Sequence, residues 1–554
     1  MLHLLLTLAL QPAAAAGLSP QELWLAWPEE RYLATPAPCL RHDELTASLE
    51  ALADRHPDGL RLTEVGRSYQ DRPIHLLTMG TGERKVMLWS QMHGDEPAAT
   101  PALLDLADFL LGGAGGDAAE EILASLTLLM IPMLNPDGAE IYERRNAQGI
   151  DINRDALNLA TPEGRTLKRI RDEHQPMLGF NLHDQNRRTA VGDTGLLATN
   201  AVLAVAGDPE GTLTPGRLRA KRACSAITET LAPFMPGGMA RYDEDWSPRA
   251  FGDNLTAWGT PVVLIESGGL PPGRDFTELT RLNFVALFKV LHELARDDLA
   301  GYGPELYDGL PRNNSDAWTD VTVDGGYLRQ PGAPTPYRAD LAFDVLRDDR
   351  AVAGCTSGRD TQSRIAEIGD ARFLGAGRRI DATGGTLLAP FVAGARGYSA
   401  RRWLDAELLT RLTRLGVGTV RWVVKPRRLD AARAHAERFQ IAGRARIEVV
   451  AAPAGEPWLR LDGAPAEPRS AALAEVVVAL LGENRRGETI GLSAGELLDR
   501  LWSTGGRQPL WPYLGRGRPA SFLLLSPAPA GRIDPAEAGL VSIWLDGVET
   551  APAP

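Results

Sequence analysis

Short apolar runs alternate with longer segments of helical hydrophobic spacing through the first 300 residues of the chain. Apolar side chains dominate residues 85–89, 126–134, 177–182 and 261–266, as is typical of strands covered on both faces of a sheet. The segments between and around these runs predict helices at 21–27, 42–55, 99–111, 161–174, 215–231 and 275–299. The alternation predicts an α/β fold class: a mixed, mostly parallel sheet with helices on both faces.

The pattern changes after residue 300. Glycine, proline and asparagine become frequent there and predict a linker at 301–330. Residues 331–554 then show short apolar runs between turn signals, which indicates a β-rich accessory domain. A length of 554 residues is too great for a single core and suggests two or three domains. From the change of pattern we expect one domain at 17–300 and an accessory domain at 331–554.

The first sixteen residues have the pattern of a secretory signal peptide. Residues 4–10 are mostly leucine, and the small alanines at 13–16 suit signal peptidase. The region lacks Lys and Arg and relies on the amino terminus and His3 for positive charge, so an untargeted apolar start is the alternative. We predict that residues 1–16 are removed and that the protein is exported, either to a periplasm or to the exterior. No other apolar run approaches the ~18 residues of a membrane span.

Composition narrows the possible partners. The formal net charge is −12 and no basic stripe offsets it, which argues against nucleic-acid binding. The three cysteines, Cys39, Cys224 and Cys355, are widely spaced and lack a zinc-like pairing. Oligomeric state cannot be inferred from these features.

A histidine and a carboxylate follow the first apolar run at close spacing. Gln91-Met92-His93-Gly94-Asp95-Glu96 places His93 and Glu96 three residues apart, where one turn can aim both side chains at a single point. Imidazole nitrogen and carboxylate oxygen suit zinc, and a catalytic zinc usually takes three protein ligands and a water. Alone, this spacing is also common in solvated loops, so a third ligand is needed.

Two later strands end in residues that complete such a site. His183 follows the run 177–182 and Glu266 ends the run 261–266, and groups at the carboxyl ends of strands gather at one edge of an open sheet. We predict that His93, Glu96 and His183 bind one zinc ion, and that Glu266 is the general base for a zinc-activated water. Taken singly, His183 could be a core histidine and Glu266 a salt-bridged carboxylate.

Polar motifs lie between these strands. Residues 135–138, Asn-Pro-Asp-Gly, predict a turn that closes the run 126–134. Three arginines follow, in Arg144-Arg145-Asn146 and in Asp151-Ile152-Asn153-Arg154. A guanidinium binds carboxylate bidentately, so arginines near zinc indicate anion recognition.

These motifs, in this order, resemble the zinc carboxypeptidases over residues 20–297. Gly66-Arg67-Ser68-Tyr69-Gln70-Asp71-Arg72-Pro73-Ile74 is also similar to a first-strand motif of that family, with Asp71 in place of a glycine.

The resemblance implies roles for the polar residues. Arg144 would polarise the scissile carbonyl and stabilise the oxyanion, with Arg145 as the alternative. Asn153 and Arg154 would bind the terminal carboxylate of a peptide, and Tyr242 would be the family's mobile tyrosine, because no other tyrosine lies between His183 and Glu266. The substrate would be a peptide with a free C-terminal carboxylate.

The accessory domain resembles the β-sandwich portions of metal-dependent amidohydrolases, at 378–390 and 540–548. Their His-x-His zinc motif is missing after Pro390, and His435 is the single histidine beyond residue 300. We therefore interpret 331–554 as a degenerate, non-catalytic domain.

The leading hypothesis is a zinc metallocarboxypeptidase. A murein-peptide amidase on the same zinc core is an alternative, which His-Gly-Asp-Glu and export favour somewhat. A catalytically inactive peptide-binding protein is a third possibility, but it predicts loss of at least one of the four core residues, and the sequence retains them all.

Overall fold

The computed structural model describes two compact units, which divide between Trp318 and Thr319. The described residues are 18–27, 40–242, 245–329, 337–346, 362–381, 383 and 386–388, with five short strands between 419 and 543. The predicted signal peptide lies outside them.

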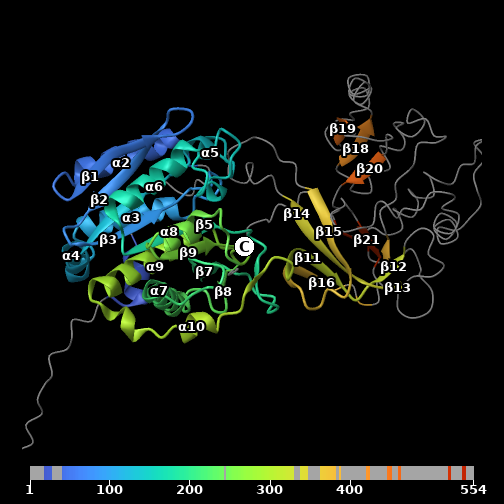
Figure 1. Ribbon diagram of the computed structural model, residues 1–554. Helices are drawn as coiled ribbons and strands as arrows, with labels where there is room; N and C mark the ends of the chain where they lie inside the picture. Colours follow the sequence, from blue (N-terminus) through green and yellow to red (C-terminus); the bar gives the residue numbers. More distant parts are fainter. Residues whose placement is uncertain are drawn as a thin grey trace, which may run out of the picture. The chain divides into compact units, whose positions relative to one another are not determined.

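The first unit is built on an eight-stranded sheet (Figure 1). Its four neighbouring central strands, β4, β3, β5 and β9, are parallel, whereas β1–β2, β2–β4 and β7–β9 are antiparallel pairs. The mixed, mostly parallel sheet predicted from the sequence is confirmed. In spatial order the strands are β1 (Leu60–Arg67), β2 (Pro73–Met79), β4 (Leu126–Ile131), β3 (Arg84–Trp89), β5 (Leu178–Asp184), β9 (Val262–Ser267), β7 (Asn200–Ala204) and β8 (Met239–Arg241).

Helices cover both faces of this sheet because successive strand side chains point to opposite sides. Val86 and Leu88 of β3 belong to one hydrophobic cluster, with α3 (Ala99–Leu111), α7 (Pro215–Leu231) and α9 (Thr277–Ala295). Met87 and Trp89 belong to a second cluster, with residues of α6 (Pro162–His174) and α8 (Phe251–Ala257). These four strand side chains are fully buried, and burying a large apolar side chain contributes about 1.5–3 kcal/mol.

Three more helices of this unit precede β4 and contribute buried side chains to the first cluster. Pro20–Ala26 forms α1, which Ser19 and Glu22 cap reciprocally, and His42–Arg55 forms α2, which buries Leu45, Leu49 and Leu52. The remaining helix before β4 is α4 (Gly116–Ser125).

Three predicted elements differ from the observed ones in their bounds or in their type. The predicted helix 275–299 is shorter: α9 ends at Ala295, and Asp297 takes a left-handed conformation that interrupts it before the short 3-10 helix η2 (Asp298–Gly301). The predicted strand 126–134 stops at Ile131, before Pro132, which has no amide hydrogen for the ladder. The expected turn at 135–138 is the first part of a short helix, α5 (Pro136–Glu140).

The motif 66–74 spans the connection between β1 and β2. Asp71, where the family motif has glycine, has a φ of 65°. Left-handed backbone is most easily adopted by glycine, and Asp is one of the few other residues that tolerate it. Asp71 therefore has a backbone conformation that a glycine would adopt readily at this position.

The segment 301–330, expected to be a linker, contains regular structure. Helix α10 (Glu305–Asp308) carries the fully buried Tyr307, and β10 (Asn313–Asn314) pairs with β6 (Ala190–Val191). The strands β11 (Trp318–Asp324) and β12 (Tyr327–Arg329) follow within the same segment. The domain boundaries at 300 and 331 stay a prediction.

All regular elements described in the second unit are strands. Sequence-distant strands pair there, such as β12 with β17 in parallel and β18 with β19 in parallel. The sheets are β15-β14-β11-β16 (Gln362–Gly369, Asp340–Leu346, Trp318–Asp324, Gly375–Asp381), β13-β12-β17-β21-β22 (Tyr337–Arg338, Tyr327–Arg329, Thr386–Leu388, Phe522–Leu525, Leu540–Ile543) and β19-β18-β20 (Arg446–Ala451, Thr419–Val424, Leu459–Asp462). The predicted likeness to amidohydrolase sandwiches stays a prediction, and His435 lies outside the described residues.

Among the described residues, no helix combines the length and the apolarity needed to cross a membrane.

Candidate metal site and its surroundings

Three neighbouring parallel strands deliver the predicted site residues to one edge of the sheet. His93 and Glu96 lie in the turn after β3, His183 is the penultimate residue of β5, and Glu266 is the penultimate residue of β9. His183 and Glu266 are directly opposite each other in the β5–β9 ladder. The carboxyl ends of parallel strands point the same way, so the fold itself gathers these groups.

The side chains of His93, Glu96 and His183 converge. Glu96 Oε1 lies 2.8 Å from His93 Nδ1, and Glu96 Oε2 lies 2.6 Å from His183 Nδ1. The two Nδ1 atoms are 3.1 Å apart, and all three residues are buried. Two imidazole nitrogens and one carboxylate oxygen are a donor set that zinc accepts, so these residues fit the predicted ion.

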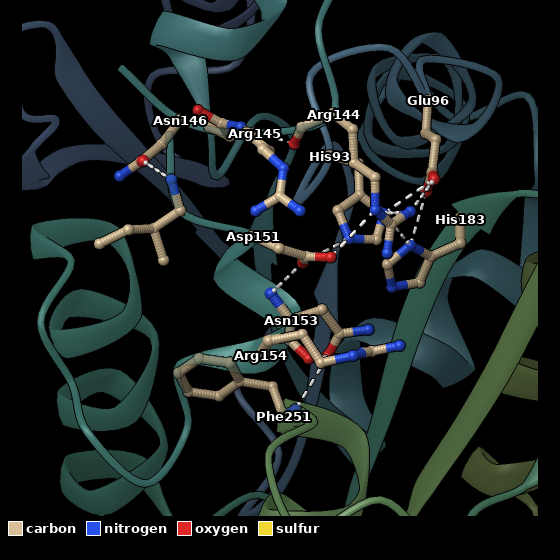
Figure 2. Close-up of polar contacts among 12 residues, drawn as sticks. His93, Glu96, Arg144, Arg145, Asn146, Asp151, Asn153, Arg154, His183 and Phe251 are labelled. Carbon is tan, nitrogen blue, oxygen red and sulfur yellow. Dashed lines mark hydrogen bonds and ion pairs between the residues drawn. The ribbon is translucent and has the colours of Figure 1, made fainter. Parts of the chain in front are cut away.

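Asp151 orients one of these histidines, a role that the sequence did not indicate. His93 Nε2 donates to Asp151 Oδ1 at 3.2 Å, which leaves the lone pair of Nδ1 facing Glu96 and His183 (Figure 2). A carboxylate behind a ligand histidine is the usual arrangement around metals. Burial alone would raise the pKa of Asp151, but His93 and Arg144 outweigh it and hold this pKa below its usual value. The signal was present, because Asp151 opens the Asp-x-Asn-Arg motif.

The structure separates the two candidate arginines. Arg144 Nη1 lies 3.1 Å from Glu96 Oε1 and 3.0 Å from His93 Nδ1, and its Nε donates to Asp151 at 3.0 Å. Arg145 is exposed, and its Nη1 donates to the carbonyl of Gly149 at 3.1 Å. Arg144 is therefore the one whose guanidinium contacts the cluster (Figure 2).

Asn153 and Arg154 lie on the other side of Asp151. The amide of Phe251 donates to Asn153 Oδ1 at 2.9 Å, which turns Asn153 Nδ2 away from Phe251. Arg154 is exposed and donates to the carbonyl of Asn153 at 2.7 Å. Figure 2 shows the Asn153 amide and the Arg154 guanidinium reaching toward the side of the site on which His183 lies. Both groups are placed to donate to an anion.

Glu266 is buried beside other carboxylates. Burial raises its pKa well above the usual value, the charges of Glu96 and Asp184 raise it further, and Arg144 opposes them. A carboxyl group in this setting takes up a proton more readily than a solvated one, as a proton-transferring residue requires.

Tyr242 lies close enough to Glu266 for the two groups to interact electrostatically. The charge of Glu266 is the main cause that raises the pKa of the Tyr242 hydroxyl, followed by burial. Tyr242 follows β8 directly, and its backbone amide donates to the carbonyl of Val202 at 3.0 Å. Elimination alone had indicated this tyrosine.

Asp184 is a second carboxylate that the sequence did not single out. Its Oδ2 accepts from the amide of Ala98, at the start of α3, at 3.1 Å, and its own amide donates to Glu96 Oε2 at 3.3 Å. Burial raises the pKa of Asp184 well above its usual value, and the charge of Glu96 adds to this. Asp184 thus connects β5, the strand that carries His183, to α3. Its position directly after His183 was the available signal.

The Asn-Pro-Asp-Gly segment anchors the arginine-bearing loop. Asn135 Oδ1 accepts from the amide of Gly138 at 3.0 Å, and Asn135 Nδ2 donates to the carbonyl of Arg144 at 3.4 Å. Asp137 is buried and accepts from Ser68 Oγ at 2.7 Å and from Arg72 Nη1 at 2.6 Å. The motif ties the β1–β2 turn to the loop that carries Arg144.

Part of this chain is similar to known proteins. Residues 45–175 match the zinc carboxypeptidase family model. Carboxypeptidase E of Caenorhabditis elegans is 32% identical over 137 residues, which make up 21% of this chain and 29% of that protein. Carboxypeptidase 2 of Trichophyton rubrum is 32% identical over 111 residues, or 20% of each chain. The chain thus spans less than a third of the length of either relative. A solved metallo-carboxypeptidase from Burkholderia cenocepacia aligns over 46% of this chain and 69% of its own, at 20% identity and a TM-score of 0.38.

Proposed function

We propose, from the match of residues 45–175 to the zinc carboxypeptidase family model, that this protein is a zinc-dependent metallocarboxypeptidase that hydrolyses the C-terminal peptide bond of peptides. The observation that carries the proposal is the convergence of His93 Nδ1, Glu96 and His183 Nδ1, with Glu266 directly across the ladder from His183. His183 and Glu266 lie outside the matched residues, so their positions support the proposal independently.

His93, Glu96 and His183 would hold one zinc ion per chain. Zinc in such a site supplies Lewis-acid chemistry, which polarises a carbonyl group and makes water a stronger nucleophile. The roles of the chain's own residues follow from their positions. Glu266 accepts a proton from the attacking water and delivers it to the leaving amine, which its raised pKa favours.

Substrate binding falls to the groups around Asp151. Arg154 and Asn153 hold the free C-terminal carboxylate through charge-assisted hydrogen bonds. Arg144, fixed by Asp151, stabilises the negative charge that develops on the carbonyl oxygen. Tyr242 covers the bound residue from the side of Glu266. An exported protein with this site would act on peptides outside the cytoplasm.

A panel of substrates tests the proposal. The purified full chain is incubated with peptides that differ in their last residue, with the same peptides amidated at the C-terminus, and with murein peptides. Release of single C-terminal residues, lost on chelation and restored by zinc, is expected. Cleavage of murein peptides alone would favour the amidase alternative. Absence of cleavage with stoichiometric zinc bound would favour the inactive binding protein.

A further inference from the structure

Gln91 has an unusual backbone conformation next to the proposed metal ligands. It lies two residues after the end of β3 and two residues before His93, and its φ is 44°. A residue with a side chain rarely occupies this left-handed region, and such a conformation persists only where the surroundings hold it in place. Gln91 is 1% exposed, so protein atoms rather than water provide those surroundings.

Both ends of the Gln91 amide are bound. Nε2 donates to the carbonyl of Gly94 at 3.1 Å, and Oε1 accepts from Thr100 Oγ1 at 2.8 Å. Because a backbone carbonyl can only accept, the nitrogen must face Gly94 and the oxygen must face Thr100. The side chain therefore links the turn that carries His93 and Glu96 to the first turn of α3.

The main chain of Gln91 makes a third connection. Its carbonyl accepts from the amide of Asn135 at 2.9 Å, which joins it to the segment that follows β4. The carbonyl of Pro132, in the same segment, lies 2.9 Å from Thr100 Oγ1, so the single hydroxyl proton of Thr100 is shared between this carbonyl and Gln91 Oε1. Gln91, which follows β3, thus forms hydrogen bonds to the His-x-x-Glu turn, to α3 and to the chain after β4.

We propose that Gln91 is a positioning residue for the metal site: it fixes the turn 93–96 so that His93 and Glu96 present their donor atoms together. The inference rests on the proposed zinc site. A metal site needs its ligands held within about 0.5 Å of the binding geometry, and groups behind the ligands usually supply that restraint. Gln91 contacts no donor atom of the cluster and acts through the backbone of Gly94.

Two substitutions in the full-length protein separate the side chain from the backbone. Gln91→Met keeps the length of the side chain and removes both amide hydrogen bonds. Gln91→Gly also removes them but relieves the left-handed backbone. Gln175 is a matched control, because it has a φ of 46° at the end of α6 but is exposed and remote from the cluster. Gln175→Met and Gln175→Gly repeat the two changes there.

The measurements are the zinc dissociation constant, by competition with a chelator, and the visible spectrum of the cobalt-substituted protein, which reports ligand geometry. Both Gln91 variants are expected to bind zinc about 10- to 100-fold more weakly than the wild type and to shift the cobalt spectrum. Both Gln175 variants should match the wild type in both measurements. The melting temperature of each metal-free variant separates weakened zinc binding from a general loss of stability.

Unchanged zinc affinity and cobalt spectra in both Gln91 variants would overturn the inference while leaving the proposed function intact. Retention of affinity in Gln91→Gly alone would also overturn it, because the backbone and not the side chain would then set the site. A wild-type protein that binds no zinc would overturn the proposed function and this inference together.

Discussion

The backbone of Gly94 lies directly against the backbone of Gly138. A Cβ atom on Gly94 would fall 2.0 Å from the carbonyl carbon of Gly138, a distance that no side chain can occupy. Gly138 in turn is enclosed by the carbonyls of Glu143 and Arg145, each 2.7 Å from where its Cβ would stand. The His-x-x-Glu and Asn-Pro-Asp-Gly motifs therefore meet through backbone contact, and this contact sets the position of Arg144 relative to His93 and Glu96.

Gly138→Ala is expected to displace the loop that carries Arg144. The added methyl group would push the carbonyls of Glu143 and Arg145 away, at a cost of about 1–3 kcal/mol in the free energy of unfolding. Urea unfolding and kcat on a peptide substrate measure the two effects. Gly301→Ala is the control, because nothing lies within 4 Å of its Cβ position. Equal stability and activity of the two variants would contradict the backbone-contact argument.

Glu266→Gln should separate metal binding from chemistry. If Glu266 moves the proton and does not bind the metal, the variant keeps stoichiometric zinc while kcat falls by about 10²- to 10⁴-fold, the usual contribution of a general base. His93→Ala, Glu96→Ala and His183→Ala should each lower the zinc content measured by elemental analysis. Loss of zinc from Glu266→Gln would reassign this residue as a ligand.

Arg154 and Arg145 are both exposed, so Arg145 can serve as the control position in a test of whether Arg154 recognises the substrate carboxylate. Arg154→Met should lower kcat/KM for a peptide acid by about 10- to 100-fold, because a hydrogen bond to a charged group contributes about 1.5–3 kcal/mol. It should also lose most of the wild-type preference for the acid over the C-terminal amide. Arg145→Met removes an arginine that contacts the carbonyl of Gly149, and it should leave that preference unchanged. A wild type that cleaves acid and amide equally would exclude carboxylate recognition.

Asp253 predicts a pH dependence of stability. Burial raises the pKa of Asp253 to about 6, although the amide of Ser247 donates to it at 2.8 Å. The unfolded chain releases this proton near pH 4, so the ionised carboxylate destabilises the folded state increasingly as the pH rises from about 4 to about 6. Asp253→Asn should therefore be more stable than the wild type at pH 7, by up to about 2–3 kcal/mol, and the difference should vanish near pH 4.

Urea unfolding of the two proteins across this pH range, with a chelator present, measures the difference. Asp58→Asn, at an exposed position, is the control and should not show it. A difference between wild type and Asp253→Asn that does not change with pH would contradict the assignment.

The sequence predicted those features of the fold and the site that depend on local patterns of apolar and polar residues. The apolar runs indicated the strands, and the order of strands placed His93, Glu96, His183 and Glu266 at one edge, where the structure brings them together. Contacts between distant segments could not be predicted this way. Asp151 reaches His93 across 58 residues, and no periodicity marks that pairing. The sequence shows Gln91 at the start of the motif 91–96 but does not reveal its role. Its left-handed backbone and its hydrogen bonds to Gly94 and Thr100 depend on how β3, β4 and α3 pack.

The final prediction concerns how many zinc ions the chain binds. Residues after 300 contain one histidine, His435, and one cysteine, Cys355, so they lack the paired histidines or cysteines of a zinc site, and carboxylates alone are poor ligands for zinc. All tightly held zinc should therefore belong to the cluster of His93, Glu96 and His183, with a stoichiometry of one ion per chain. In the full-length protein, His435→Ala should keep the wild-type zinc content after dialysis, whereas His183→Ala should lose it. Elemental analysis of the two variants and the wild type decides the matter. A second tightly held ion that disappears in His435→Ala would mean that the C-terminal part binds metal, and it would overturn its interpretation as a degenerate domain.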